Sequence, residues 1–212
     1  MDPVGRYVAS IGDDHVLRVW GAAAVARDVG GPAPAPEAGV SSPFKRSAQA
    51  AVVRLDWSPD GEFLVASNAI DRRRHVAAVL GRRREWAVCA TFVGHEAAVV
   101  AVRFAPALYA PTGAGGDPGA RRAAHFSVCA VGSLDATLSI WATHSVTPLA
   151  VVGDGLFGAG VTDVAWHPSR PSLLAVSLDG SLACVELEER ELAAGGASAL
   201  TARERDSVLR DT

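Results

Sequence analysis

The sequence predicts an all-β protein built from repeated antiparallel units of four strands. About 13 short apolar runs, rich in Val, Ala, Leu and Trp, alternate with turns rich in Gly, Pro, Asp and Ser. Their mean spacing of roughly a dozen residues is typical of strands joined by hairpins, and no helical crossovers of a parallel α/β fold separate them. An aspartate also recurs in a turn, six residues before a tryptophan or valine of the predicted strand that follows. The pairs are Asp14 and Trp20, Asp135 and Trp141, and Asp179 and Val185.

The composition is that of an ordinary soluble globular protein. Of the 212 residues, 49% are hydrophobic and 20% are charged, and the net charge of −3 indicates neither a nucleic-acid nor a membrane partner. The cysteines lie apart in apolar runs without metal-ligand spacing, so we expect buried, reduced thiols of an intracellular protein. The start has no signal-peptide pattern, and without a run of about 18 apolar residues we expect no membrane-spanning helix.

The strands group into units that occupy residues 1–187. The first unit is incomplete, because it begins in the turn before its second strand. The units lie at approximately 2–27, 52–95, 99–153 and 161–187. Each of the last three carries an aromatic residue in its first strand, two positions before a proline that ends the strand and opens a turn. These aromatic residues are Trp57, Phe104 and Trp166.

Two segments rich in Pro, Ala, Gly and Ser interrupt this rhythm, at residues 28–50 and 107–124. We expect both to be surface loops. The tail at 188–212 is polar and charged, and it is either a short surface helix or a disordered end. Within it Thr201 is a predicted N-cap, because Glu204 stands three residues later as in a capping box.

The repeat resembles the WD40 β-propeller family, in which each unit is one blade. The Gly-His element in "FVGH" and the segment "GSLDATLSIW" carry this resemblance. It implies a buried network of a histidine, a strand-two serine, a turn aspartate and a strand-three tryptophan, which here are His95, Ser133, Asp135 and Trp141. Each of these polar groups is expected to be buried between blades, where a group without a partner would cost roughly 1–3 kcal/mol. Because the four groups satisfy one another there, we interpret the network as structural rather than catalytic. A β-sandwich is the alternative all-β fold.

The order of longer motifs resembles the HIRA family of histone-regulatory WD40 proteins over residues 2–205. The motifs are "FVGHEAAVVAVRF", "CAVGSLDATLSIW" and "VSLDGSLACVEL". A seven-blade ring needs about 280 residues at roughly 40 per blade. We therefore expect a propeller fragment from the C-terminal half of the family's ring, with about three complete four-stranded antiparallel blades plus a partial N-terminal blade. Alone, it is expected to be oligomeric or insoluble, because a strand edge and an apolar blade face are left uncovered.

The resemblance implies a non-enzymatic scaffold in the nucleus, with subunits of a histone chaperone complex and core histones as partners. The implied processes are replication-independent nucleosome assembly and transcriptional repression. One alternative is a WD40 scaffold of another chromatin-assembly complex or of an unrelated complex. Another is an enzyme of the propeller-hydrolase type, which would need titratable groups that converge in a central channel. No catalytic residue, cofactor, metal site or small-molecule substrate is predicted.

Six arginines flank one predicted strand in "DRRRHVAAVLGRRREW". One interpretation is a basic patch that contacts DNA phosphates or acidic chaperone partners, since arginine presents a bidentate fork to both. The other is two solvated hairpin ends whose charge protects a sheet edge. The arginines are Arg72, Arg73, Arg74, Arg82, Arg83 and Arg84.

Overall fold

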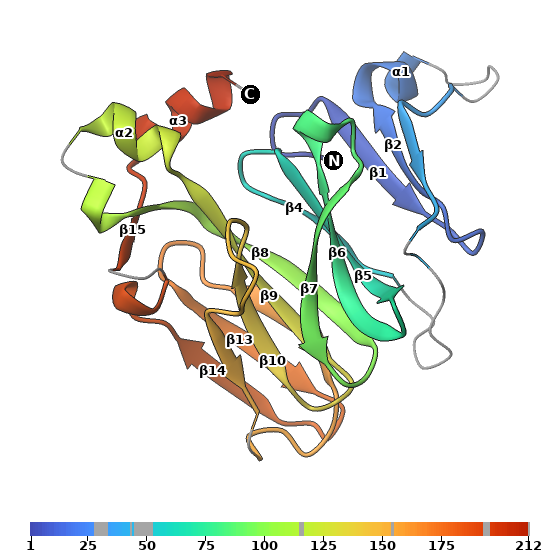
Figure 1. Cartoon of the computed structure of the whole chain (residues 1–212), viewed down its shortest axis with the longest axis vertical. Helices are drawn as coiled ribbons and strands as arrows, with labels where there is room; N and C mark the ends of the chain where they lie inside the picture. Colours follow the sequence, from blue (N-terminus) through green and yellow to red (C-terminus); the bar gives the residue numbers. More distant parts are fainter. Residues whose placement is uncertain are drawn as a thin grey trace.

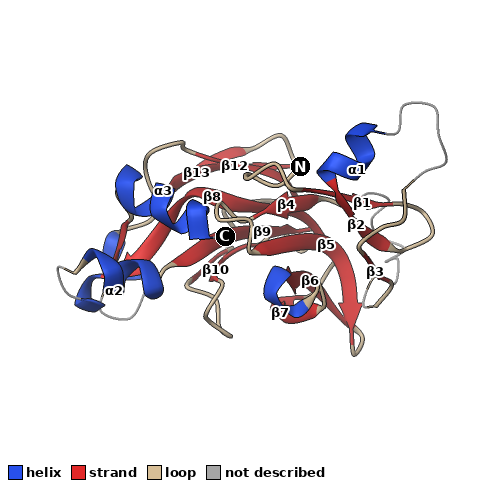
Figure 2. Ribbon diagram, turned by 90° about the horizontal axis from the view of Figure 1, so that it is seen from above, coloured by secondary structure: helices blue, strands red, loops and turns tan. Residues whose placement is uncertain are grey.

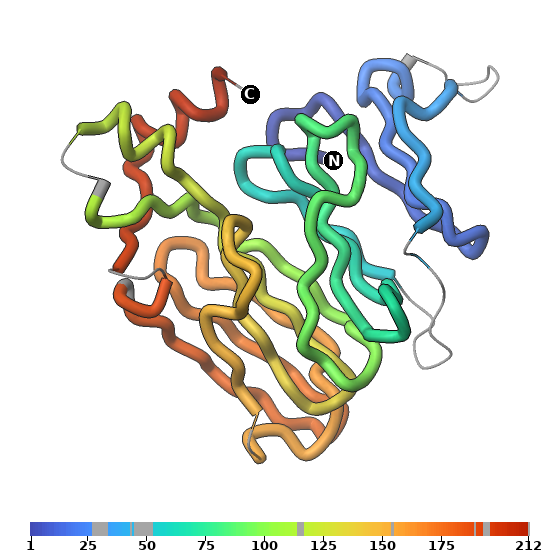
Figure 3. Tube along the Cα trace, viewed as in Figure 1, coloured from blue at the N-terminus to red at the C-terminus, as the bar shows by residue number. Residues whose placement is uncertain are grey.

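Four antiparallel sheets follow one another along the chain in the computed structural model (Figure 1). The tube in Figure 3 leads from the blue first sheet on the right to the orange fourth sheet on the left, so sheets that are neighbours in sequence are also neighbours in space. The structure describes residues 1–27, 34–42, 44, 53–114, 117–153, 155–192 and 196–211.

The sheets differ in their number of strands. The first contains β1 (Tyr7–Ile11), β2 (Leu17–Gly21) and β3 (Ala38–Val40). The second contains β4 (Leu55–Trp57), β5 (Phe63–Asp71), β6 (Arg74–Gly81) and β7 (Val88–His95). The third contains β8 (Val99–Pro111), β9 (Phe126–Ser133), β10 (Leu138–Ala142) and β11 (Ala150–Val152), with β15 (Ala197–Ala199) added at its β8 edge. The fourth contains β12 (Val161–Trp166), β13 (Ser172–Ser177) and β14 (Leu182–Glu186).

Helices and 3₁₀ turns occupy the connections at one end of the strands. The helices are α1 (Ala22–Arg27), α2 (Pro118–Ala123) and α3 (Ala202–Asp211), and the 3₁₀ turns are η1 (Arg82–Arg84), η2 (Thr112–Ala114) and η3 (Glu189–Glu191). We call the end that carries the three helices the helix face, and the opposite end, with the β5–β6, β9–β10 and β13–β14 turns, the turn face (Figure 1). Seen from above in Figure 2, α2 and α3 lie together and α1 lies apart beside the first sheet. None of the helices in the described part of the chain is long and apolar enough to span a bilayer.

The sheets pack face to face because both faces of the central strands are apolar. Successive side chains of a strand point to opposite faces, and in β5 the neighbours Leu64 and Val65 are both fully buried yet belong to different apolar clusters. In β9, Ala130 and Val131 divide in the same way between the clusters that face the fourth and second sheets. Three clusters thus fill the three spaces between consecutive sheets. This arrangement confirms the WD40 propeller-type fold and excludes a two-sheet sandwich.

The fourth sheet differs from the complete blade that the sequence predicts, because only three of its strands lie in the described residues. After β14 the chain turns away, and its next strand, β15, pairs with β8 instead. The outer face of this sheet remains open and apolar, and Cys184 on it is exposed rather than buried. The large exposed side chains of this region are Leu174, Val176, Leu178 and Leu182.

The segment 107–124 is not the loop that its composition predicts. β8 continues to Pro111, because β15 supplies a hydrogen-bonding partner for its last residues. α2 then follows, with Asp117 accepting hydrogen bonds from the amides of Gly119 and Ala120 as its N-cap. Sequence analysis missed this helix although an aspartate followed by a proline is a helix start signal.

The other two irregular segments are partly ordered. Within residues 28–50, β3 pairs with β2, whereas 28–33, 43 and 45–50 lie outside the described residues. In the tail at 188–212, α3 confirms the helical alternative. The Thr201 amide donates to the Glu204 carboxylate at 2.8 Å, and the Glu204 amide donates to Thr201 Oγ1 at 3.3 Å, which is the predicted capping box.

Candidate functional site

A chain of buried polar side chains joins the second sheet to the third. His95, at the end of β7, places Nε2 2.7 Å from Ser139 Oγ and Nδ1 2.9 Å from Thr137 Oγ1. The Trp141 indole N–H donates to the same Ser139 Oγ at 2.7 Å, while the indole ring stacks on Phe92 at 4.9 Å. We call His95, Asp135, Thr137, Ser139 and Trp141 the inter-sheet clamp.

One arrangement of protons satisfies every member of the clamp. Ser139 Oγ accepts from Trp141, so the serine proton is available to His95 Nε2. The Nδ1–H then donates to Thr137 Oγ1, whose own proton goes to the Asp135 carboxylate. Each donor therefore has an acceptor, which the burial of His95 and Ser139 requires.

Asp135 anchors the clamp from the β9–β10 turn. Its Oδ1 accepts from the Thr137 amide at 3.0 Å, and its Oδ2 lies 3.3 Å from His95 Nδ1 and accepts from the Glu96 amide at 2.7 Å. Burial raises the pKa of this carboxyl, but the hydrogen bonds from His95, Thr137 and the Glu96 amide outweigh burial and hold the pKa well below its usual range. The aspartate thus stays ionised and holds the incoming β7–β8 loop against the turn.

Asp179 repeats this arrangement in the fourth sheet. Its carboxylate accepts from the Ser181 amide at 2.7 Å and from the Gly158 amide, in the loop that enters the sheet, at 2.6 Å. The hydrogen bonds from Ser181, then that from Gly158, lower its pKa to about 2. The recurring aspartate is explained by this double task, which is to close the turn and to hold the loop that leads into the same sheet.

Ser133 is not the serine of the clamp, which corrects the expectation from sequence. Its hydroxyl donates to the Ala97 carbonyl at 3.0 Å and lies 3.3 Å from the Asp135 amide. Ser177 makes the equivalent bond to the Ala159 carbonyl at 2.8 Å, so this position ties the entering loop to the second strand of its sheet. The clamp serine is Ser139, which shares one face of β10 with Trp141, two residues further on.

The clamp is a structural element by its geometry. The side chain of His95 is 2% exposed, and Ser139 as a whole is 3% exposed. A nucleophile must present its oxygen to a substrate beside an oxyanion pocket, whereas Ser139 is enclosed between two sheets. Asp135, His95 and Ser139 have the residue types of a catalytic triad, but this resemblance is superficial.

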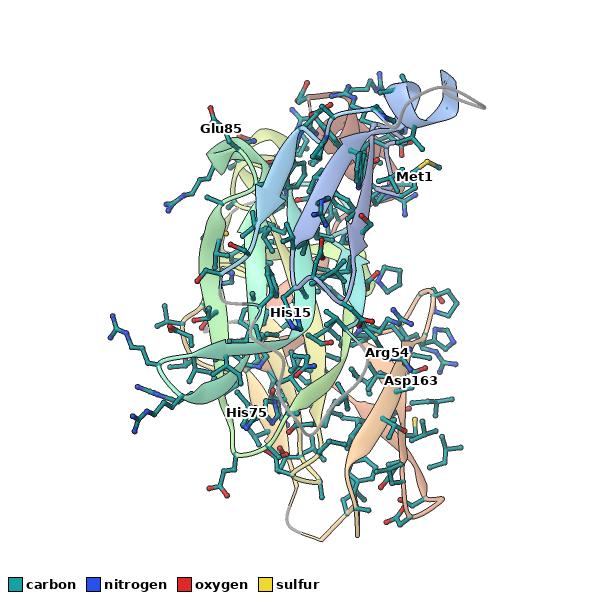
Figure 4. All side chains as sticks on the ribbon, turned by 90° about the vertical axis from the view of Figure 1, so that its right-hand side faces the viewer. Met1, His15, Arg54, His75, Glu85 and Asp163 are labelled. Atoms are coloured by element: carbon teal, nitrogen blue, oxygen red, sulfur yellow. The ribbon has the colours of Figure 1, made fainter. Side chains whose placement is uncertain are left out.

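The first strands of the last three sheets are also linked, by contacts that sequence analysis missed. The Asp56 carboxylate accepts from the Phe104 amide at 2.7 Å, and the Trp166 indole donates to the Arg103 carbonyl at 2.9 Å. Arg54 lies 3.5 Å from the Asp163 carboxylate, and Figure 4 shows these two labelled residues beside each other. These bonds fix β4, β8 and β12 side by side, as the inner strands of neighbouring blades are in a propeller.

The six arginines do not form one patch. Arg72, Arg73 and Arg74 are exposed at the turn face, whereas Arg82, Arg83 and Arg84 form η1 at the helix face. Arg74 begins β6 and Arg82 follows its last residue, so even these nearest members of the two triplets lie about 26 Å apart at 3.3 Å per residue. In Figure 4, Glu85, which follows the second triplet, lies near the top of the molecule, and His75, which follows the first, lies far below it.

Comparison with known proteins agrees with this geometry. Residues 153–184 match the family described as "WD domain, G-beta repeat". The chain is 36% identical to Protein HIR1 of Cryptococcus neoformans over 211 residues, which cover 97% of this chain and 22% of that protein. The chain belongs to the HIRA family of WD40 proteins. The HIRA homolog of Drosophila melanogaster is 35% identical over 75% of this chain and 14% of that protein. Human Protein HIRA is 34% identical over 74% of this chain and 15% of that protein.

The HIRA relatives are much longer than this chain, which spans only about a seventh to a fifth of them. The family and the repeat describe a scaffold-type protein rather than a known class of enzyme. In the described part of this HIRA-family chain, no three His, Cys, Asp or Glu side chains gather as a metal site would require.

Proposed function

We propose that this chain is a non-enzymatic scaffold of a HIRA-like histone chaperone complex in the nucleus. In this proposal it serves replication-independent nucleosome assembly and transcriptional repression, with core histones and the other subunits of the complex as its partners. The observation that carries the proposal is the relationship itself, since up to 97% of the chain aligns with HIR1 and HIRA proteins at 34–36% identity.

The fold supports a scaffolding mechanism. Proteins of this kind bind partners through loops that a rigid frame holds in place. Here the frame is the stack of apolar clusters, and the inter-sheet clamp and the Asp56–Phe104 bond lock neighbouring sheets together. Turns at both faces therefore keep fixed positions relative to one another, so that one partner can contact several sheets at once.

Affinity capture followed by mass spectrometry tests the proposal. A tag at Met1 (75% exposed), which lies at the helix-face end, leaves the clamp and the turn face free. An unrelated WD40 propeller with the same tag is the control, because it removes proteins that bind the fold in general. We expect histone chaperone subunits and core histones to be enriched over this control. Enrichment of other complexes alone would instead support a WD40 scaffold of a different assembly.

A further inference from the structure

A small cavity on the helix face lies where the third and fourth sheets meet. Its volume is ≈ 130 Å³, whereas sites that enclose a whole small molecule usually span about 300–1,000 Å³. The cavity therefore has room for one side chain of a ligand rather than for all of it. Its walls come from the second half of β8, the β12–β13 turn, the residue after η3 and β15. The principal lining residues are Pro106, Tyr109, His167, Arg170, Leu192 and Ala199.

The β12–β13 turn fixes the proton of His167 in this cavity. Nδ1 of the ring accepts from the Ser169 amide at 3.1 Å and from the Arg170 amide at 3.2 Å. A ring nitrogen that accepts carries no proton, so the proton is on Nε2, which is therefore a donor. Arg170 Nη2 lies 3.5 Å from this Nε2. Because both atoms are donors, neither can satisfy the other, and the pair lacks an acceptor.

Tyr109 adds a third donor to the same cavity. The residue is only 4% exposed and its ring packs on that of Phe126, yet no residue in the described part of the chain bonds its hydroxyl. Burial raises the pKa of Tyr109 to about 12, so the hydroxyl keeps its proton. A buried tyrosine hydroxyl usually has a hydrogen-bond partner. An unpaired one that lines a cavity with two other free donors indicates an acceptor from outside the chain.

The cavity carries a single positive charge. Among the described residues no carboxylate pairs with the exposed Arg170, and none of the residues that line the cavity is acidic. His167 is neutral, since its Nδ1 is an acceptor. One carboxylate balances this charge, whereas a phosphate group carries about −1.5 to −2 at pH 7. The exposed Pro106 and Pro168 and the half-buried Pro171 supply apolar surface for the stem of an acidic side chain.

We propose that this cavity binds the side-chain carboxylate of a glutamate on a partner protein, with the carboxylate on His167, Arg170 and Tyr109. The two oxygens of a carboxylate can accept from donors that lie 3.5 Å apart, through charge-assisted hydrogen bonds. The methylene groups of the glutamate would lie against the prolines. Because the cavity holds little more than this side chain, the rest of the ligand must lie on the surrounding surface, as a protein segment does. The inference does not depend on which complex the chain serves.

Methyl NMR of the full chain tests the proposal, because the methyl groups of Leu192 and Ala199 belong to residues that line the cavity. The first probe is butyrate, which reproduces the glutamate side chain, and butyramide is its neutral counterpart. The second probe is a blocked tripeptide, acetyl-Leu-Glu-Leu amide, which carries the same carboxylate on a protein-like segment. Inorganic phosphate is the competing anion.

The test variants are Arg170→Gln and Tyr109→Phe, and the second removes only a hydroxyl. Their matched controls are Arg72→Gln, which removes the same charge at the turn face, and Tyr7→Phe, at the only other tyrosine of the chain. A third test variant is His167→Asn. Its amide oxygen can replace Nδ1 as the acceptor in the turn, but it lacks the Nε2–H donor. Circular dichroism establishes that each variant is folded, and three independent test variants keep the proposal open to refutation if one of them unfolds.

We expect butyrate to shift both methyl resonances saturably, and butyramide to bind about tenfold or more weakly, because hydrogen bonds to a charged acceptor are the stronger ones. Each test variant should weaken butyrate binding about fivefold or more, and each control should change it by less than about twofold, since only the test variants lose a contacting donor. The tripeptide should bind about threefold or more tightly than butyrate, because its leucines add apolar contacts at the rim.

Four results would overturn the proposal. Equal affinity for butyrate and butyramide would show that the three donors do not select a carboxylate. Equal losses in Arg170→Gln and Arg72→Gln would assign binding to net charge alone. Tighter binding of phosphate than of butyrate, with the same dependence on Arg170 and Tyr109, would make the cavity a phosphate site. Tighter binding of butyrate than of the tripeptide would exclude a protein segment as the occupant.

Discussion

Replacing Ser139 by alanine should destabilise the chain far more than replacing Ser133. In Ser139→Ala, both the Trp141 indole N–H and His95 Nε2 lose their partner between two sheets, and both side chains are buried there. An unsatisfied buried polar group costs about 1–3 kcal/mol, so two of them predict a loss of about 2–6 kcal/mol in the free energy of unfolding. The apolar contact of Trp141 with Phe92 is retained, so the loss reports on the hydrogen bonds.

Ser133→Ala is the matched control, because Ser133 is equally buried and the substitution is identical. It removes the bond to the Ala97 carbonyl and the longer bond from the Asp135 amide, and both of these residues are only half-buried, so water can replace the hydroxyl. The expected loss is about 0.5–1.5 kcal/mol. Urea unfolding followed by tryptophan fluorescence measures both values. A cost for Ser133→Ala that equals or exceeds that of Ser139→Ala would refute the clamp as assigned here.

Three further predictions concern other parts of the molecule. The Asp60 hydrogen bond raises the pKa of His125, while the pKa of Asp60 is lowered because its hydrogen bonds from His125 and Ser58 outweigh burial. The stabilisation by this pair is complete between pH 3.8, the ordinary pKa of Asp60, and pH 6.5, the ordinary pKa of His125. It is lost as the pH falls through the lowered pKa of Asp60 or rises through the raised pKa of His125. The melting temperatures of Asp60→Asn and wild type should therefore differ most between pH 3.8 and 6.5. Gly160→Ala places a Cβ 2.7 Å from a backbone Cα and should cost about 1–3 kcal/mol in urea, whereas Gly113→Ala, with open space around it, should be neutral. Leu174→Asp on the open apolar face should reduce self-association in sedimentation velocity, and unchanged association would assign it to another surface.

Features set by local sequence could be predicted well. The apolar runs located most strands. Alternating apolar residues mark a strand that is buried on one face, and a short continuous apolar run marks a strand that is buried on both. The chemistry of the turns located Asp135, whose carboxylate must bind the amide two residues on, and the capping box at Thr201 and Glu204 needs only one helical turn.

Features set by contacts between distant segments could not be predicted in this way. Ser133 and Ser139 are both buried and face the same side of the third sheet, and the choice between them depends on where the end of β7 crosses β10. β8 extends through a segment of loop-like composition because β15, nearly 90 residues later, pairs with it. By contrast, the separation of the two arginine triplets follows from the length of β6 alone and was open to sequence analysis.

The central claim is that this chain performs the part of a HIRA-family propeller in histone deposition. The most direct measurement is a chimera in which it replaces the aligned segment of HIR1 in Cryptococcus neoformans, with which it shares 36% identity. Incorporation of a tagged histone is then measured in cells arrested outside DNA replication. We predict that the chimera restores incorporation lost on deleting the segment, and that the Ser139→Ala chimera restores it less well. A folded, expressed chimera that restores none would contradict the account.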